Sequence, residues 1–368
     1  MKTLYPKAKH GIVNRVTGSI FKYQGWPTVA RDENGTLYVG ASGFRIGHVC
    51  PFGKTVMYIS KNEGESWTPP IVINDTYMDD RDAGLLYMGN GKMLLSWFCL
   101  PLSDYSADWW LDCVNKWNSP EGVKASYGML DAIKLLPENK LIGGSFLRTT
   151  DDYGVTWGET IRLPISAPHG PSMCRDGSLV YLGLEFCSEG ELPHKSVALY
   201  KSRDKGNSWE KVSVIPSPSW LAKGEFLDEP HIIELPDGRL LGAFRTEPSF
   251  RIATAISSDG GKSWSEVTMT EATGAPPHLM LHSSGAVICS YGRRQAPNGE
   301  RAMVSYNGGE SWEEEYILSE SPSGDLGYPS TVELADGSLI TVYYQRYDGD
   351  SYPSVLYTKW SLDEGRDK

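Results

Sequence analysis

The chain has 368 residues, of which 40% are hydrophobic, 22% charged and 11% aromatic, a composition typical of a globular protein with a large core. A net charge of −11 and the lack of any Lys/Arg-rich run argue against a nucleic-acid-binding surface. No apolar run approaches the length of a membrane span, and the amino-terminal residues lack the apolar core of a signal peptide. We expect a cytoplasmic protein, or a secreted or periplasmic one if a signal peptide has been removed, with no nucleic-acid or membrane partner.

The six cysteines show no CxxC spacing and stand mostly in apolar, strand-like stretches. This pattern favours buried free thiols in a reducing compartment over disulfides or a structural metal site. The seven histidines are dispersed, with no HxH or HExxH spacing, and nothing in the sequence indicates a nucleotide or redox cofactor. We therefore expect neither a metal ion nor a cofactor.

One eight-residue phrase recurs five times and organises the chain. It reads hydroxyl residue, any residue, Asp or Asn, any residue, Gly, any residue, hydroxyl residue, Trp, and we call it the Trp phrase. The copies occupy residues 60–67, 150–157, 202–209, 257–264 and 305–312. Asp or Asn followed two residues later by Gly is turn chemistry, and the Trp is a large apolar anchor. A repeat at intervals of about 50 residues predicts an array of similar units, so the phrase is structural rather than catalytic.

Apolar alternating runs joined at Gly turns are interleaved with the Trp phrases. They occupy residues 26–40, 82–97, 169–181, 229–245, 277–291 and 328–344. Several pairs of runs meet at Asp-Gly or Asn-Gly, which predicts β-hairpins. Six such hairpins, five of them followed by a second hairpin with a Trp phrase, make about four strands per unit. The sequence therefore predicts an all-β, six-bladed β-propeller.

The chain is predicted to be a single domain over residues 1–368, with an insertion in the second blade at about residues 98–130. The long interval between the first two Trp phrases contains the insertion, whose Trp109, Trp110 and Trp117 do not alternate as in a strand. We expect it to be partly helical and to lie over the propeller or at a subunit contact in a homo-oligomer. The carboxy-terminal run 354–360 is expected to close the ring by pairing with the amino-terminal stretch.

Ionisable residues gather where the first strand of each unit begins or the next strand ends. The strand starts carry Asp80, Arg81, Asp82, His169, Glu229, His231, His278 and Tyr328, and the strand ends add Arg45, Arg245, Arg293, Arg294 and Arg301. Each alone is more often an ordinary surface or channel residue. In a propeller these positions converge on one face near the axis, which predicts a site for a polar ligand.

The Trp phrases resemble Asp boxes, also called BNR repeats, and nearly the whole chain resembles the sialidase (neuraminidase) superfamily of six-bladed propellers. Glu229 and Arg245 lie in a segment similar to the one that supplies the family's catalytic Glu and an Arg that binds the substrate carboxylate. Arg301 resembles another Arg of that carboxylate-binding triad. Tyr328, in the context Gly-Tyr-Pro-Ser-Thr-Val, resembles the nucleophilic Tyr.

The resemblance implies a coherent mechanism. Sialic acids carry a carboxylate on the anomeric carbon, which Arg guanidinium groups bind by charge-assisted hydrogen bonds. A carboxylate nucleophile would be repelled by that substrate, whereas a neutral Tyr deprotonated by a neighbouring Glu is not; sialidases are a recognised exception to the two-carboxylate scheme. Tyr328 would be the nucleophile and Glu229 its base.

The first blade departs from the family pattern. Where the family has its first triad Arg, this chain reads Gly25-Trp26-Pro27, although Arg45 at the end of the next strand is expected to point into the same space. The stretch that holds the family's acid/base Asp, residues 46–54, contains no carboxylate here. His48, with a pKa near neutrality, is one candidate for the proton donor, and Asp80 or Asp82 is the carboxylate alternative.

Three functions remain open from the sequence. The first is an exo-α-sialidase-like glycoside hydrolase that releases a terminal sialic acid or related acidic sugar from glycans. The second is a propeller hydrolase or lyase for another anionic glycan, such as a uronic-acid polymer, and the third is a non-catalytic carbohydrate-binding propeller. The predicted catalytic residues are Tyr328, Glu229, Asp80 and His48. The predicted substrate-binding residues are Arg45, Arg81, Asp82, His231, Arg245, His278 and Arg301.

Overall fold

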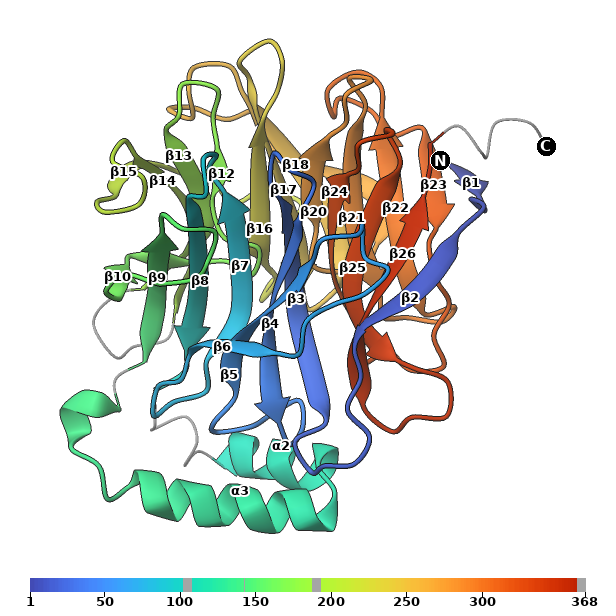
Figure 1. Cartoon of the computed structure of the whole chain (residues 1–368). Helices are drawn as coiled ribbons and strands as arrows, with labels where there is room; N and C mark the ends of the chain where they lie inside the picture. The colour runs from blue at the N-terminus through green and yellow to red at the C-terminus, as the bar shows by residue number, and fades with distance from the viewer. Residues whose placement is uncertain (102–107, 142, 187–192, 363–368) are drawn as a thin grey trace.

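A computed structural model describes residues 1–101, 108–141, 143–186 and 193–362 of the chain. Six sheets, antiparallel except for one edge strand, are arranged around a central axis, so the predicted all-β, six-bladed propeller is confirmed (Figure 1). The first strand of the first blade packs against the first strands of the second and sixth blades, which places the inner strands around the axis.

The first three blades use consecutive strands of the chain, running from the axis outward. The first contains β3 (Tyr23–Arg31), β4 (Leu37–Arg45), β5 (Lys54–Ser60) and β6 (Ile71–Asn74). The second contains β7 (Arg81–Tyr87), β8 (Met93–Cys99), β9 (Gly144–Thr150) and β10 (Ile161–Leu163). The third contains β12 (Ser172–Met173), β13 (Leu179–Phe186), β14 (Pro193–Ser202) and β15 (Glu210–Val214), and the short β11 (Ile165–Ser166) also pairs with β13.

The last three blades include the two amino-terminal strands. The fourth contains β16 (Phe226–Glu234), β17 (Leu240–Glu247), β18 (Arg251–Ser257) and β19 (Thr268–Thr273). The fifth contains β20 (His278–Leu281), β21 (Val287–Arg293), β22 (Gly299–Ser305), β23 (Glu314–Ile317) and β1 (Lys2–Leu4). The sixth contains β24 (Gly327–Glu333), β25 (Leu339–Arg346), β26 (Pro353–Trp360) and β2 (Lys9–Asn14).

The ring is closed from both ends of the chain. β2 pairs antiparallel with β26, with Lys9 opposite Lys359, which confirms the predicted closure of the sixth blade. β1 adds a parallel strand to the outer edge of the fifth blade, with Lys2 opposite Glu314. The sequence analysis did not predict this second closure, because β1 is too short to show a period.

The Trp phrase forms a hydrogen-bonded turn at the outer side of each blade that carries it. In the third copy, the carboxylate of Asp204 accepts hydrogen bonds from the backbone N–H and hydroxyl of Ser208, at 2.8 and 2.6 Å. The N–H of Gly206 donates to the Ser202 hydroxyl at 2.8 Å, and the Trp209 indole donates to the Gly206 carbonyl at 3.0 Å. Trp209 then packs against a cluster formed by the second and third blades. The phrase thus fixes the turn and fills the joint between neighbouring blades.

Two α-helices lie between β8 and β9, in the region of the predicted insertion. α2 (Asp108–Trp117) and α3 (Pro120–Ile133) are followed by the short 3₁₀ helix η1 (Glu138–Lys140), and part of the predicted stretch falls outside the described residues. The helices cross the end of the propeller at which β4 ends (Figure 1). α3 begins at Ser119, whose hydroxyl accepts a hydrogen bond from the Gly122 N–H at 3.1 Å. Among the described residues, no helix is long and apolar enough to cross a membrane.

The Gly positions of the fourth Trp phrase provide a test of how the phrase packs. Gly260 and Gly261 both have a positive φ, 73° and 89°. A Cβ at Gly260 would meet nothing within 4 Å, whereas one at Gly261 would collide with the buried Leu199 of the third blade. Gly260→Ala should therefore cost only the backbone strain, about 1–2 kcal/mol, and Gly261→Ala a further ~1–3 kcal/mol from the collision. Urea unfolding midpoints of the two variants measure the difference, and equal midpoints would contradict this packing.

Candidate active site

A β-bulge stands near the start of the inner strand in four of the blades. The pairing register shifts there in β3, β7, β16 and β24. Each bulge holds a residue other than Gly at positive φ: Trp26 at 52°, Asp82 at 54°, Glu229 at 41° and Tyr328 at 52°. Such backbone is costly for a side chain with a Cβ, and bulges commonly re-aim a side chain at a functional site. Four residues with unlike chemistry thus share one strained position.

Tyr328 and Glu229 meet across the axis. The Tyr328 hydroxyl donates a hydrogen bond to one oxygen of Glu229, and the Arg245 guanidinium pairs with the other oxygen. Arg245 also pairs with Glu247, so it lies between two carboxylates. The structure therefore brings together three residues of the predicted site: Tyr328, Glu229 and Arg245.

Arg294 is the second guanidinium at Tyr328. Its charged centre lies 5.5 Å from the centre of the Tyr328 ring, and it donates hydrogen bonds to the Leu326 carbonyl and the Tyr344 hydroxyl, each at 3.1 Å. The sequence analysis noted Arg294 at a strand end but favoured Arg301. Arg301 was preferred because it stands shortly before a Trp phrase, as in the family pattern. In the structure Arg294, and not Arg301, lies beside Tyr328.

Burial and neighbouring charges shift the pKa values of the cluster. Burial, and then the charges of Glu229 and Asp82, raise the pKa of the Tyr328 hydroxyl well above 10, so Tyr328 is neutral at rest. Burial raises the pKa of Asp82 to about 7, and one of its oxygens is buried without a hydrogen-bond partner. Burial and the charge of Glu229 also raise the pKa of Asp228 to about 7. Asp228 was not among the predicted site residues. One of its carboxylate oxygens accepts a hydrogen bond from the Glu229 backbone N–H.

Trp26 occupies the bulge in the first blade, where the family pattern has an Arg. The guanidinium groups of Arg81 and Arg45 lie 4.2 and 4.5 Å from its ring centre, which are cation–π distances. The other neighbours of its ring are Tyr328 and His48, with centroids at 6.3 and 5.2 Å. Trp26 is therefore an apolar surface in contact with both Tyr328 and His48.

His48 is held by a carboxylate that the sequence analysis missed. Its Nδ1 lies 2.7 Å from the Tyr23 hydroxyl and 3.1 Å from a carboxylate oxygen of Asp325, three residues before Tyr328. The hydrogen bonds that the structure records for this ring all involve Nδ1. Burial lowers the pKa of His48 below 6.5, and the hydrogen bond and charge of Asp325 oppose that shift. The arrangement is a His–Asp pair suited to proton transfer.

Three of the predicted site residues lie outside this cluster. Arg301 is 1% exposed and donates to the backbone carbonyls of Glu300, Ser319 and Pro297, so its charge is held within the fifth blade. Asp80 is fully buried, where its carboxylate accepts bonds from Thr76 and Cys99. Arg45 is fully buried and pairs with Asp79. The predictions that these residues contact substrate or transfer a proton are corrected on this ground.

His231 and His278, which were predicted to bind substrate, instead lie with His169 inside the central channel. The rings of His231 and His278 stack at 4.6 Å, and His169 meets His278 at 4.9 Å. The Nδ1 atoms of His231 and His278 accept backbone N–H bonds from Leu279 and Thr331, at 3.0 and 3.3 Å. All three rings are buried, and they line a cavity whose walls include neither Tyr328 nor Glu229.

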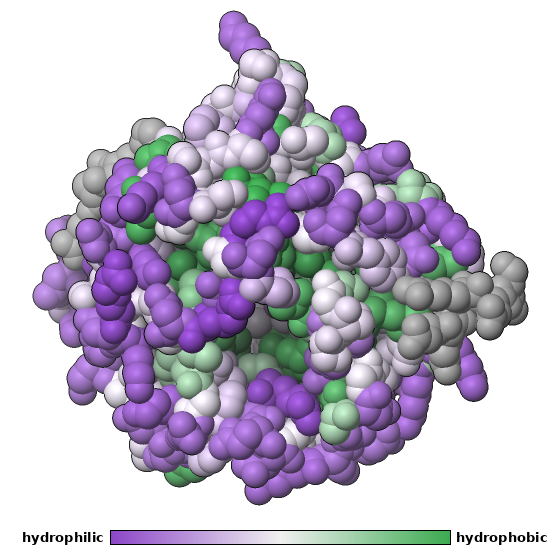
Figure 2. All heavy atoms as spheres, turned by 90° about the horizontal axis from the view of Figure 1, so that it is seen from above, coloured by the Kyte–Doolittle hydropathy of each residue, from purple (hydrophilic) through white to green (hydrophobic). Residues whose placement is uncertain are grey.

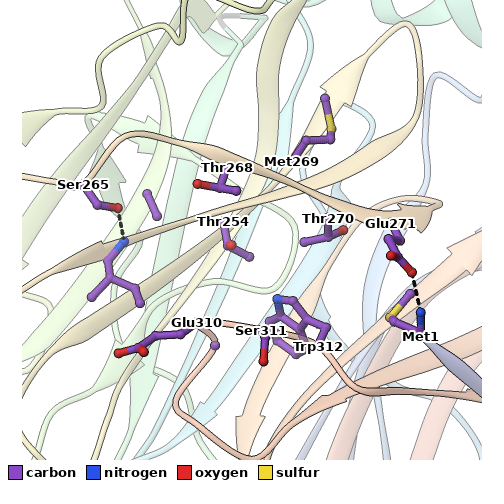
Figure 3. Close-up of a pocket in the computed structure, with 13 residues that line it drawn as sticks. Met1, Thr254, Ser265, Thr268, Met269, Thr270, Glu271, Glu310, Ser311 and Trp312 are labelled. Atoms are coloured by element: carbon purple, nitrogen blue, oxygen red, sulfur yellow. Dashed lines mark hydrogen bonds and ion pairs between the residues drawn. The ribbon is translucent and has the colours of Figure 1, made fainter.

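Two other cavities contain none of the residues Tyr328, Glu229 and Arg245. One, of about 230 Å³, is lined by the three channel histidines and by the far ends of inner strands, and a hollow is visible at the centre of the face opposite the helices (Figure 2). The other, of about 310 Å³, lies at the outer strands of the fourth blade and the Trp phrase of the fifth, where Glu271 pairs with the amino group of Met1 (Figure 3). Among the described residues, no group of three His, Cys, Asp or Glu side chains is arranged to hold a metal ion.

Comparison with known proteins identifies the family. The family described as BNR repeat-like domain matches residues 133–341, which is more than half of the chain. The chain belongs to this family. No curated protein sequence matches it.

Solved structures share the fold of this BNR-family propeller at low sequence identity. A protein of unknown function from Dyadobacter fermentans is 19% identical, with a TM-score of 0.75, over 97% of this chain and 99% of that one. The NanB sialidase from Streptococcus pneumoniae is 14% identical, with a TM-score of 0.69, over 96% and 71%. An α-L-arabinanase from Penicillium chrysogenum is 14% identical, with a TM-score of 0.62, over 98% and 100%. The similarity establishes the propeller fold. The substrate has to be inferred from the side chains of the site, because one fold can serve many functions.

The channel histidines should make the stability of this BNR-family propeller depend on pH. Burial lowers the pKa of His231 to about 3 and those of His169 and His278 well below 6.5. Below pH 6.5 the unfolded chain therefore binds protons that the folded chain does not, and the free energy of unfolding falls with pH. We expect a loss of about 2 kcal/mol per histidine between about pH 7.5 and pH 5. Urea unfolding at both pH values should show a smaller loss for His231→Gln, and an equal loss would contradict the burial of a neutral ring.

Proposed function

We propose that the chain is an exo-acting glycoside hydrolase of sialidase type, with Tyr328 as the nucleophile. The hydrogen bond from Tyr328 to Glu229 carries this proposal, because a non-catalytic binding propeller has no use for a buried Tyr held against a carboxylate by a strained backbone. The likeness to a sialidase and to an arabinanase supports glycoside hydrolysis and does not decide the sugar.

In the first step, the Tyr328 oxygen forms a bond to the anomeric carbon and its proton passes to Glu229. The bond from that carbon to the leaving-group oxygen breaks, and His48 in its protonated form gives a proton to this oxygen. The step needs Glu229 because the raised pKa of Tyr328 keeps the hydroxyl neutral. Asp325 holds the His48 ring by Nδ1 and stabilises its positive charge.

In the second step, neutral His48 takes a proton from water as the water oxygen attacks the anomeric carbon. The bond to Tyr328 breaks, and Glu229 returns its proton to the phenolate. Both groups end in their starting states, and the configuration at the sugar is retained because two displacements occur.

We propose a carboxylate-bearing sugar, a sialic acid or a related acidic sugar, as the substrate. Two guanidinium groups, Arg245 and Arg294, stand on the Tyr328 side of the site, and the buried Asp82 is available to a sugar hydroxyl. Trp26 in place of a third Arg predicts a weaker hold on the carboxylate than a complete triad would give.

Removal of the nucleophile provides the first test. Tyr328→Phe should lower kcat by at least about a thousandfold, because the ring remains and only the reacting oxygen is lost. The melting temperature should stay within a few degrees. The substrates are aryl glycosides of sialic, deaminated sialic and uronic acids and of neutral arabinose, with absorbance monitored for an unsaturated lyase product.

The outcomes of this screen separate the three functions. Activity that survives Tyr328→Phe would remove Tyr328 from the mechanism. Cleavage of uronides with an unsaturated product would favour a lyase, and no cleavage of any substrate by the wild-type protein would favour a binding propeller.

The role of His48 can be tested by the leaving group. His48→Asn should lower kcat/KM for glycosides with poor leaving groups by about 10²–10⁴-fold, yet spare kcat/KM for those with activated leaving groups such as dinitrophenol, whose first step needs no proton. The kcat for activated substrates should still fall, because the second step uses His48 as the base. Asp82→Asn is the matched variant and should slow both classes alike. If Asp82→Asn instead shows the strong dependence on leaving group, Asp82 and not His48 is the proton donor.

A further inference from the structure

A cavity of about 160 Å³ lies beside His48, between the helices and the sixth blade. Its walls include His48 and Asp325, Lys116 and Ser119 of the helical insertion, Arg346 at the end of β25 and Tyr352 in the loop that follows. The Ser119 N–H donates to the Tyr352 hydroxyl at 3.0 Å, which ties the insertion to that loop. The cavity is thus built from segments of the first, second and sixth blades.

This cavity adjoins the reacting groups from the side of the proposed proton donor. The His48 and Tyr328 rings both lie against Trp26, so the cavity beside His48 adjoins the site of the proposed nucleophile. In a displacement at an anomeric carbon, the leaving group departs on the side of the proton donor and away from the nucleophile. A group that His48 protonates would therefore extend into this cavity.

The cavity offers an unpartnered cationic group to a ligand. The Arg346 guanidinium lines it, and its Nε is buried with no hydrogen-bond partner among the described residues. Lys116 also lines the cavity, and the positive end of the α3 dipole lies at Ser119. The carboxylate in the wall, Asp325, is already engaged by His48 and Tyr23. A buried guanidinium nitrogen without a partner is costly unless an anion or another acceptor reaches it.

We propose that this cavity is the leaving-group subsite and that it selects a leaving group with an anionic substituent, a carboxylate or a sulfate. The inference rests on the proposed glycoside hydrolysis. It makes the helical insertion a specificity element, because Lys116 and Ser119 belong to it. The acidic sugar binds on the Tyr328 side, and the second acidic group binds at Arg346.

The kinetic test compares leaving groups on one sugar. The substrates carry 4-carboxyphenyl, 4-sulfophenyl or neutral 4-carbamoylphenyl leaving groups, and kcat/KM is measured for the wild type, Arg346→Met and Lys116→Met. The ratio of each charged substrate to the neutral one should fall about tenfold in Arg346→Met, and by a smaller factor in Lys116→Met. Intrinsic reactivity cancels when ratios are compared between variants. Arg203→Met, which removes an exposed Arg in the third Trp phrase, is the control and should leave the ratios unchanged.

A binding test separates this inference from the proposed function. Calorimetric titration of 4-hydroxybenzoate, 4-hydroxybenzenesulfonate and neutral 4-hydroxybenzamide onto Tyr328→Phe needs no catalysis. We expect the anions to bind more tightly than the amide, and Arg346→Met in the same background to remove the preference. The carboxylate and sulfonate arms show which anion the cavity favours.

The outcomes are distinct. If the wild type hydrolyses no glycoside but the anions bind in an Arg346-dependent manner, the proposed function fails and the anion site stands. If the amide binds as well as the anions, or Arg346→Met and Lys116→Met change neither ratio nor affinity, the subsite is overturned.

Discussion

The bulge at the start of the inner strands is the constraint on which the site depends. It places one residue in each of four blades at positive φ, near the axis, in a backbone that an ordinary strand would avoid. Because the blades repeat, the same distortion presents Trp26, Asp82, Glu229 and Tyr328 to one space. A regular strand would direct each of these side chains into a blade interface instead, since alternate residues face opposite sides of a sheet. The cores between blades, anchored by the Trp phrases, offset the cost of this strain.

The charged neighbours of Glu229 and Asp82 give these two carboxyl groups different environments. Arg245 lies between Glu229 and Glu247 and pairs with both carboxylates, beside the neutral Tyr328. Asp82 occupies the equivalent position in the second blade, where burial raises its pKa to about 7 and one of its oxygens has no hydrogen-bond partner. Two carboxyl groups at the same backbone position thus differ in their partners, because only Glu229 has a guanidinium bonded to it. Trp26 completes the set as a wall, with cations stacked on its ring.

Much of the fold and half of the site could be predicted from the sequence, for physical reasons that particular residues illustrate. The Trp phrases could be predicted because their turn chemistry depends on residues close in sequence. Three site residues, Tyr328, Glu229 and Arg245, could be predicted because they lie in segments with a recognisable family pattern. Arg294 directly follows β21 and Arg301 lies on β22 of the same hairpin, and only the geometry of that hairpin decides which guanidinium reaches Tyr328. Asp325 escaped prediction because its contact with His48 spans the closure between the sixth and first blades, which leaves no local signal. The prediction of Asp80 as a proton donor is not supported, because the bulge is at Asp82, two residues later, and Asp80 is left buried.

The double closure of the ring has a consequence for how the chain acquires its structure. Residues 2–14 are synthesised early, yet their partners, β23 and β26, are made near the end of translation. Until then β1 and β2 have no partner strands, and unpaired strands invite pairing with other chains. The site shares this delay, because Tyr328 and Asp325 belong to the last blade and His48 to the first. The protein is therefore without its proposed catalytic groups in register until its two ends meet, so any activity would report on the completed ring.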